Sequence, residues 1–296
     1  MALTYTYDDN SIREDLLDII TNMSPQETQL LSGLGTSSAK DTMHIWLKDT
    51  LKSVAANSHI EGADATYPDR TDPERMYNHC QIVRVGYDVT DSERAVNNAG
   101  FSDRYNYETT KALKEWKNDT EYALMRGSMA TGAGTTARAM KGIKRFLLSN
   151  NYTNASGISL TETILNDRFE DVWSDGTQVN ALYVPMYMKR KISQFTGGAT
   201  KNVDVTDRRL VLAVDIYQAD AATNVKLFAH RYVHVSGDTN YDVVGIDEDK
   251  FKVAYLRKPF TRELAKTGDS TKGEVIGELT MECLHEDAGF YAEKML

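Results

Sequence analysis

The most regular hydrophobic pattern in the sequence is helical and runs from Arg104 to Arg126. Apolar or small residues recur every three or four positions, which places them in one stripe along a helix. The stripe consists of Tyr105, Thr109, Ala112, Leu113, Trp116, Thr120, Ala123 and Leu124. No Gly or Pro interrupts it, and Gly127 follows where a helix end is expected. Such a helix is roughly 33 Å long, and we expect it to lie along a sheet as a strut.

A shorter amphipathic helix is predicted at Ser11–Met23. Its apolar stripe contains Ile12, Leu16, Ile19, Ile20 and Met23. Ser11 and Glu14 have the spacing of a capping box, and Pro25 ends the helix. A helix this short is marginal in water, so the stripe must dock on another surface. That surface is either its own domain or a neighbouring subunit.

The region after this helix has the pattern of a long β-hairpin. Met43–Leu51 and Met76–Thr90 are its predicted legs, and Asn57–Arg75 is a polar tip. In the second leg, apolar residues from Val83 to Val89 alternate with polar ones, as in a half-buried strand. The tip has too little apolar content for a core of its own, and we expect it to be mobile unless a neighbour holds it. We therefore expect the first 90 or so residues to reach outward and to do little to enclose a core.

From about Ile143 to Asp249 the chain alternates helix and strand, which indicates a compact α/β or α+β lobe. The predicted helices are Leu160–Ser174 and the basic Met186–Phe195, and the predicted strands are Ala181–Val184, Leu210–Tyr217 and Val225–Val235. Two late strands, Val253–Leu256 and Glu274–Cys283, are expected to return to the sheet beneath the long helix. The first domain would then be discontinuous.

Several stretches, taken in order, resemble one protein family. They are Tyr7–Ile20, Ser24–Thr28, Leu31–Gly35, Glu61–Ala65, Ala95–Gly100, Lys189–Gly198 and Glu263–Ser270. Together they resemble the major capsid (head) proteins of tailed bacteriophages of the SU10-like group, from near residue 4 to near residue 283. No single stretch is a strong motif; their joint order carries the resemblance.

The resemblance implies the HK97-like capsid fold. Its expected parts are an N-terminal arm (1–39), an extended β-hairpin loop (40–90), a peripheral domain with the long spine helix on a sheet (91–145 and 250–296), and an inserted axial α/β lobe (146–249). The arm and the hairpin would contact neighbouring subunits.

The implied function is structural. The resemblance predicts a major capsid protein that self-assembles, through pentamers and hexamers, into an icosahedral head around double-stranded DNA. The expected partners are other copies of the chain, portal, scaffold or decoration proteins, and packaged DNA held by non-specific contact. Assembly is expected in the host bacterial cytoplasm, with the product in the virion. An encapsulin-type compartment, which shares the fold, and a serine hydrolase using Ser37 and Lys40 are the alternatives.

Composition is compatible with this reading. The chain has 296 residues, of which 41% are hydrophobic and 26% charged, as in an ordinary globular protein. No apolar run approaches the roughly 18 residues that would span a bilayer, and the N-terminus lacks the pattern of a secretory signal. We therefore expect no membrane partner. The net charge of −9 argues against a dedicated nucleic-acid binder, but it suits the wall of a DNA container.

Two enzyme-like motifs lack the context that their chemistry needs. Gly132–Ala137 matches the dinucleotide fingerprint GxGxxA, but a long helix precedes it instead of a strand. Ser37–Lys40 and Lys266–Gly268 match two of the three motifs of penicillin-recognising enzymes, but the middle motif is missing. We interpret the first as a flexible loop and the second as a chance match.

The remaining candidates are also weak. His230 and His234 have helical ligand spacing but lie in a predicted strand, and Asp247–Asp249 lacks the ligand pattern of an EF-hand and is read as a solvated cap. Lys189–Lys191, with Arg208 and Arg209, is either a solvated helix face or a contact with DNA or a neighbouring subunit. Cys80 and Cys283 are expected to be ordinary thiols. We predict no enzyme and no catalytic, cofactor-binding or metal-binding residue.

Overall fold

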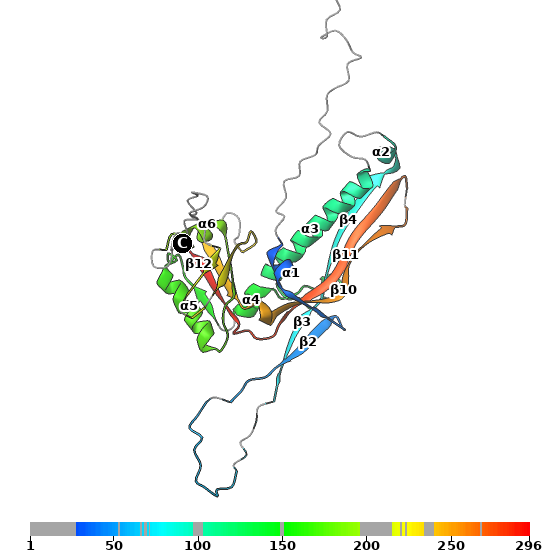
Figure 1. Ribbon diagram of the computed structural model, residues 1–296. Helices are drawn as coiled ribbons and strands as arrows, with labels where there is room; N and C mark the ends of the chain where they lie inside the picture. The colour runs from blue at the N-terminus through cyan, green and yellow to red at the C-terminus, as the bar shows by residue number, and fades with distance from the viewer. Residues whose placement is uncertain are drawn as a thin grey trace, which may run out of the picture.

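The computed structural model describes residues 28–52, 54–65, 67, 70, 72–96, 103–148, 151–195, 215–219, 221–222, 224–233, 240–266 and 268–296. These residues form two lobes and one long segment, between β2 and β3, that projects away from them (Figure 1). One lobe has a long helix lying along a sheet, and the other has a second sheet flanked by helices (Figure 1).

The helices and strands, in chain order, are α1 (Gln29–Gly33), β1 (Gly35–Ser38), β2 (Met43–Lys48), β3 (Glu74–His79), β4 (Gln81–Thr90), α2 (Asp91–Ala95), α3 (Arg104–Arg126), α4 (Ile143–Leu147), β5 (Tyr152–Asn154), α5 (Glu162–Ser174), β6 (Ala181–Val184), α6 (Met186–Ile192), β7 (Ile216–Tyr217), β8 (Val225–Ala229), β9 (Tyr241–Ile246), the 3₁₀-helix η1 (Glu248–Lys250), β10 (Phe251–Leu264), β11 (Ser270–Cys283) and β12 (Gly289–Met295).

The predicted long helix is confirmed, because α3 has both of the expected ends. The Asp103 carboxylate caps its start by accepting a hydrogen bond from the backbone N–H of Tyr105 at 3.0 Å. At its end the chain passes between two carbonyls. A Cβ on Gly127 would lie 2.5 Å from the carbonyl oxygens of Ala123 and Met140, so only glycine fits there.

The long helix covers one face of a four-stranded sheet with the strand order β1-β10-β11-β4 (Figure 1). Trp116 lies at the centre of this contact, and its indole N–H donates to the backbone carbonyl of Val83 at 3.0 Å. Gly277 on β11 leaves room for the ring, since a Cβ there would lie 2.7 Å from it. The alternation predicted in the second leg is confirmed for β4, where Val83 and Val89 are buried.

The second lobe contains a six-stranded mixed sheet with the order β5-β12-β9-β6-β8-β7. The prediction that all of 250–296 accompanies the long helix is wrong for β12, which pairs with β9 and β5 in this sheet. The first four residues of β12 are buried, so the strand has the continuous burial of an interior position. Its sequence alone does not say which sheet receives it.

Two other strand predictions are not confirmed in full. Of Leu210–Tyr217, only residues 215–217 are described, and Ile216–Tyr217 form β7. The prediction of one strand over Val225–Val235 is wrong after Ala229, where β8 ends and a turn begins. The helices predicted at Leu160–Ser174 and Met186–Phe195 are confirmed as α5 and α6 with slightly shorter bounds.

The hairpin is shorter than predicted. β2 pairs antiparallel with β3, but β4 pairs with β11, so the prediction of one continuous second leg at Met76–Thr90 is wrong. The chain changes sheets at Cys80, which is fully buried and whose N–H donates to the carbonyl of Thr42 at 2.8 Å. The Asn78 side chain fixes the turn by donating to the carbonyl of Met281 at 2.8 Å.

The N-terminal part of the described chain belongs to the core. Leu30 in α1 is fully buried, and Leu34 joins the same cluster as Leu124 of the long helix. The prediction that the first 90 or so residues add little to the core is therefore wrong at these positions and at Trp46. The helix predicted at Ser11–Met23 lies outside the described residues.

Candidate functional site

The first candidate site is an apolar surface on the segment that connects β2 to β3. The described residues between 49 and 73 connect β2 to β3 and stand away from both lobes (Figure 1). Four apolar side chains on this connection are 85% to 103% exposed, namely Leu51, Val54, Ile60 and Tyr67. Covering such a side chain would contribute about 1.5–3 kcal/mol each.

The paired strands β2 and β3, which lead into and out of this connection, carry further exposed apolar side chains. Met43, Ile45 and Leu47 alternate along β2, and Ile45 lies opposite Tyr77 on β3. All four side chains are between 40% and 64% exposed. On the opposite face of the same ribbon, Trp46 is buried and its indole N–H donates to the carbonyl of Cys283 at 2.6 Å. One face of the ribbon is therefore anchored and the other is open.

We call these eight side chains the hairpin surface: Met43, Ile45, Leu47, Leu51, Val54, Ile60, Tyr67 and Tyr77. Monomeric proteins rarely expose apolar side chains in such a group, and larger groups mark interaction sites. The arrangement suits docking on another protein surface.

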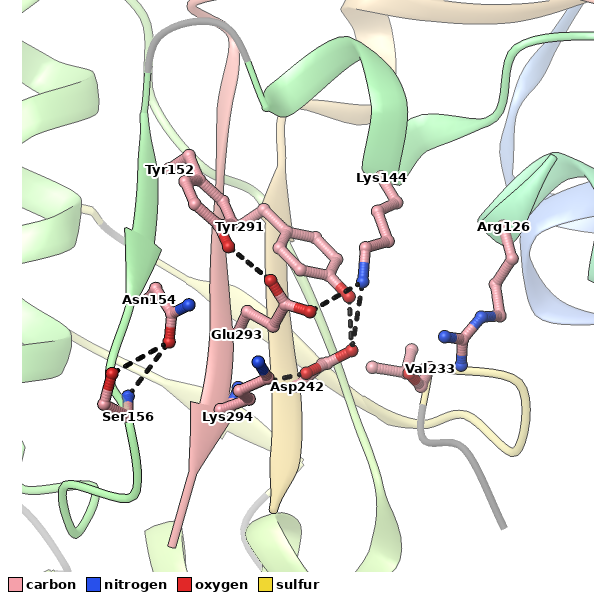
Figure 2. A network of polar contacts seen from close by, with 10 residues as sticks. All are labelled: Arg126, Lys144, Tyr152, Asn154, Ser156, Val233, Asp242, Tyr291, Glu293 and Lys294. Atoms are coloured by element: carbon pink, nitrogen blue, oxygen red, sulfur yellow. Dashed lines mark hydrogen bonds and ion pairs between the residues drawn. The ribbon is translucent and has the colours of Figure 1, made fainter. Parts of the chain in front are cut away.

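A second feature is a network of charged and tyrosine side chains inside the second lobe (Figure 2). Lys144 reaches from α4 toward two carboxylates, with its Nζ 3.3 Å from Glu293 and 3.8 Å from Asp242. The Tyr291 hydroxyl donates to Asp242, and the Tyr152 hydroxyl donates to Glu293. The network thereby ties α4 to the strands β5, β9 and β12 (Figure 2).

The tyrosines of this network remain hydrogen-bond donors at neutral pH. Burial, with the neighbouring Asp242 carboxylate, raises the pKa of Tyr291 above its ordinary range. The hydrogen bond to Glu293 raises the pKa of Tyr152 to about 12. Burial opposes the charge on Glu293, but the Tyr152 hydroxyl and the Lys144 ammonium together lower its pKa. The arrangement is a structural tie in which each charge has a partner.

The structure separates the serine-enzyme candidates. Ser37 lies in β1, where its hydroxyl donates to Glu282 at 2.7 Å, and Lys40 is exposed. Lys266 lies beyond the far end of β10 and pairs with Asp91 at 2.8 Å. Ser37 lies beside Ala254, so about 30 Å of strand separates it from that end, at roughly 3.3 Å per residue. The two motifs do not form one site.

The dinucleotide-like stretch is a tight loop. Ala130 pairs with Ala139 and Ala133 with Thr136 across it, and Gly132 has a φ of 78°. Neither a strand before it nor a helix opening from it is present in this described region, so the fingerprint geometry is missing.

The histidine and aspartate candidates have structural roles in the described region. His230 is 3% exposed and its Nε2 lies 2.9 Å from Glu121, while His234 lies outside the described residues. Asp247 caps η1 by accepting from the N–H of Asp249 at 3.2 Å, as predicted. Among the residues described, no group of three His, Cys, Asp or Glu side chains is placed to hold a metal.

The basic run is mostly used inside the subunit. Lys189 pairs with Asp215 at 2.9 Å, and the Lys191 ammonium donates to the Ser159 hydroxyl at 2.6 Å. Arg190 is exposed and lies over the ring of Tyr187. Arg208, Arg209 and the adjoining loop at 196–198 lie outside the described residues.

The two cysteines are free, as predicted, and both are buried. Burial raises the pKa of Cys80 to about 11 and that of Cys283 to about 12, so both remain protonated thiols at neutral pH. No described helix has the length and apolar character needed to cross a membrane.

Comparison with solved structures defines the class of the protein. The chain is similar to a subunit from the capsid of a native GTA particle (TM-score 0.70, 8% identity, 100% of both chains). It is also similar to a chain of Gordonia phage Cozz (TM-score 0.66, 11% identity, 97% of this chain and 92% of that one). The fold is therefore that of HK97-like capsid proteins.

Comparison of sequences identifies the family within this fold. The family model of the SU10 major capsid protein matches residues 2–294, and the chain belongs to that family. It is 31% identical over 131 residues to the major capsid protein of Escherichia phage Phieco32. That match covers 44% of this chain and 37% of the relative, so it spans well under half of the relative's length. The predicted family and fold are confirmed.

Proposed function

We propose that copies of this chain assemble, through pentamers and hexamers, into a closed icosahedral head around double-stranded DNA. The observation that supports this most is the hairpin surface. Apolar side chains that are almost completely exposed in one subunit need a cover, and an adjacent copy supplies one at every position of a shell. Assembly would take place in the host bacterial cytoplasm.

The proposed mechanism depends on many repeated contacts of modest strength. The long helix stiffens one lobe, and the Lys144 network ties the other lobe together, so the subunit presents its contacts in a fixed geometry. The net charge of −9 keeps the wall from binding phosphate tightly, so contact with DNA is non-specific. Portal, scaffold or decoration proteins are further proposed partners, and catalysis has no part in the mechanism.

We keep the proposed division into arm, hairpin, peripheral domain and axial lobe with two shifts. The hairpin ends at Cys80, because β4 belongs to the sheet under the long helix. The segment from Gly289 onward belongs with the axial lobe, because β12 lies inside its sheet.

The test replaces the four loop members of the hairpin surface by serine, as L51S/V54S/I60S/Y67S. Purified protein is then examined by size-exclusion chromatography and negative-stain electron microscopy. We expect a folded subunit that forms no closed shells. The matched control changes four neighbouring positions of little apolar area, as A55S/N57S/A63S/A65S, and should assemble normally. Shells of normal size and yield from the first variant would refute the role of the loop.

The encapsulin alternative is separated by cargo. A phage head isolated from infected cells should contain DNA, whereas a protein compartment should co-purify with an enzyme. A serine hydrolase would be labelled by a serine-reactive β-lactam probe, and the separation of Ser37 from Lys266 predicts no labelling.

A further inference from the structure

A fully buried carboxylate lies where the N-terminal segment meets the long helix. Glu121 is on α3 and has no exposed surface. Its Oε1 accepts the backbone N–H of Leu30 at 2.7 Å, and its Oε2 accepts that of Leu31 at 2.9 Å. Among the described residues, no Lys or Arg forms an ion pair with it, so its charge depends on hydrogen-bond donors.

The third donor comes from the other lobe. The Nε2 of His230, which follows β8, lies 2.9 Å from Oε1 of Glu121. The Nδ1 of His230 accepts the backbone N–H of Tyr232 at 3.3 Å, so the ring proton belongs on Nε2 and points at the carboxylate. One carboxylate therefore joins three parts of the molecule, namely the start of α1, the C-terminal third of α3 and the segment that follows β8 in the second lobe.

The end of α1 also meets the second lobe. A Cβ on Gly33 would lie 3.1 Å from Oε1 of Glu248 and 3.8 Å from the Tyr183 hydroxyl. Tyr183 donates to Glu248 at 2.6 Å, and its ring packs edge-on against the imidazole of His230. Both ends of α1 are therefore held by side chains of one cluster: Glu121 contacts its start, and Glu248 lies against its end.

We propose that Glu121 is a positioning residue for assembly. It fixes the root of the N-terminal arm, by which we mean residues 28–34, to the long helix and, through His230, to the second lobe. The start of the described chain, at residues 28–34, is then held in place by the subunit body. This inference rests on the proposed function, in which the arm contacts neighbouring copies. Without the carboxylate, the two N–H groups of α1 lose their acceptor and the root detaches.

Hydrogen–deuterium exchange on unassembled full-length subunits tests the root directly. In Glu121→Gln, one oxygen is replaced by an NH₂ group that opposes an N–H donor. We expect a peptide covering 28–34 to exchange at least about tenfold faster, because hydrogen bonds to charged groups are among the stronger ones. A peptide from the start of α3 should change less than about twofold. The control is Glu115→Gln on the same helix, where the side chain is half exposed.

Two changes at His230 keep the test decisive if Glu121→Gln does not fold. His230→Gln retains an N–H donor and should keep exchange at 28–34 close to that of the unchanged protein. His230→Leu removes the donor and should raise it. Unchanged exchange at 28–34 in both Glu121→Gln and His230→Leu, or an equal rise in every peptide, overturns the proposal.

Electron microscopy of the same variants tests the consequence for assembly. A loosened root should lower the yield of closed shells at least about fivefold. Normal yields from a variant with a loosened root would overturn the role in assembly. A chain lacking residues 1–27 that still forms normal shells would instead refute the proposed contribution of the arm, whatever exchange reports at the root.

Discussion

Replacing Lys144 by methionine removes the cation that lies between Asp242 and Glu293 and keeps a side chain of similar length. The side chains of these three residues are only 16%, 10% and 22% exposed. Exposed ion pairs contribute about 0–1 kcal/mol, whereas removing one partner of a buried pair costs about 3–5 kcal/mol. The Lys144 ammonium also lies 4.8 Å from the centre of the Tyr291 ring.

This site lies between those limits, so we expect Lys144→Met to lower the free energy of unfolding by about 2–3 kcal/mol at pH 7. The measurement is urea unfolding of unassembled subunits, followed by tryptophan fluorescence. Lys111→Met is the control. Lys111 is 44% exposed and pairs with Glu108 and Glu115 at 3.8 and 3.9 Å, so its loss should cost less than about 0.5 kcal/mol.

The stability difference between Lys144→Met and the unchanged protein should also depend on pH. The pKa of Glu293 is lowered in the folded protein from its ordinary value of 4.5. Its contribution is therefore present above about pH 4.5 and is lost as the pH falls through the lower folded value. The difference between Lys144→Met and the unchanged protein should shrink in that range. A loss below about 0.5 kcal/mol at pH 7, or a difference that does not change with pH, would refute the reasoning.

Two further predictions concern the core and the N-terminus. Gly277→Ala should cost about 1–3 kcal/mol in the same urea assay, because its Cβ would lie 2.7 Å from Trp116. Gly86→Ala, with nothing within 4 Å of its Cβ, should be close to neutral, and equal effects at the two positions would contradict this account. A chain without residues 1–27 should fold but form no shells. A chain without residues 1–33 should lose cooperative unfolding, because it lacks the buried Leu30 and leaves Glu121 without its two backbone N–H donors.

Local patterns predicted the elements that depend on local physics. The long helix could be placed because its apolar spacing and Gly127 both lie within or beside it. The alternation of β4 could be predicted in the same way. Pairing between distant strands could not be predicted, because the burial pattern of a strand does not show which strand it pairs with. This is why β12 and the division of the hairpin at Cys80 were missed: both depend on contacts with residues about 40 to 200 positions away.

The polar ties were missed for the same reason. Lys144 meets Asp242 and Glu121 meets His230 only after folding, and each pair is about 100 residues apart in sequence. One signal was available at Glu121, because it follows Thr120 and precedes Ala123 at the buried edge of the helical stripe. A charged residue in that place implies a partner. The hairpin surface was also underestimated, since the tip was read as polar although it holds Ile60 and Tyr67.

The two halves of the hairpin surface have different roles in docking. Fixing the backbone costs about 1–2 kcal/mol for each residue that becomes ordered, whereas burying one apolar side chain contributes about 1.5–3 kcal/mol. Docking of the connection is therefore favourable only where few residues must be ordered for each apolar side chain that is buried. The ribbon face of Met43, Ile45, Leu47 and Tyr77 carries no such cost, because β2 and β3 are already paired and Trp46 anchors them to the body. Docking should therefore begin on the ribbon face, with the connection adding its contacts afterwards. A subunit whose body is rigid and whose ribbon is anchored can then build a shell from contacts that are each weak.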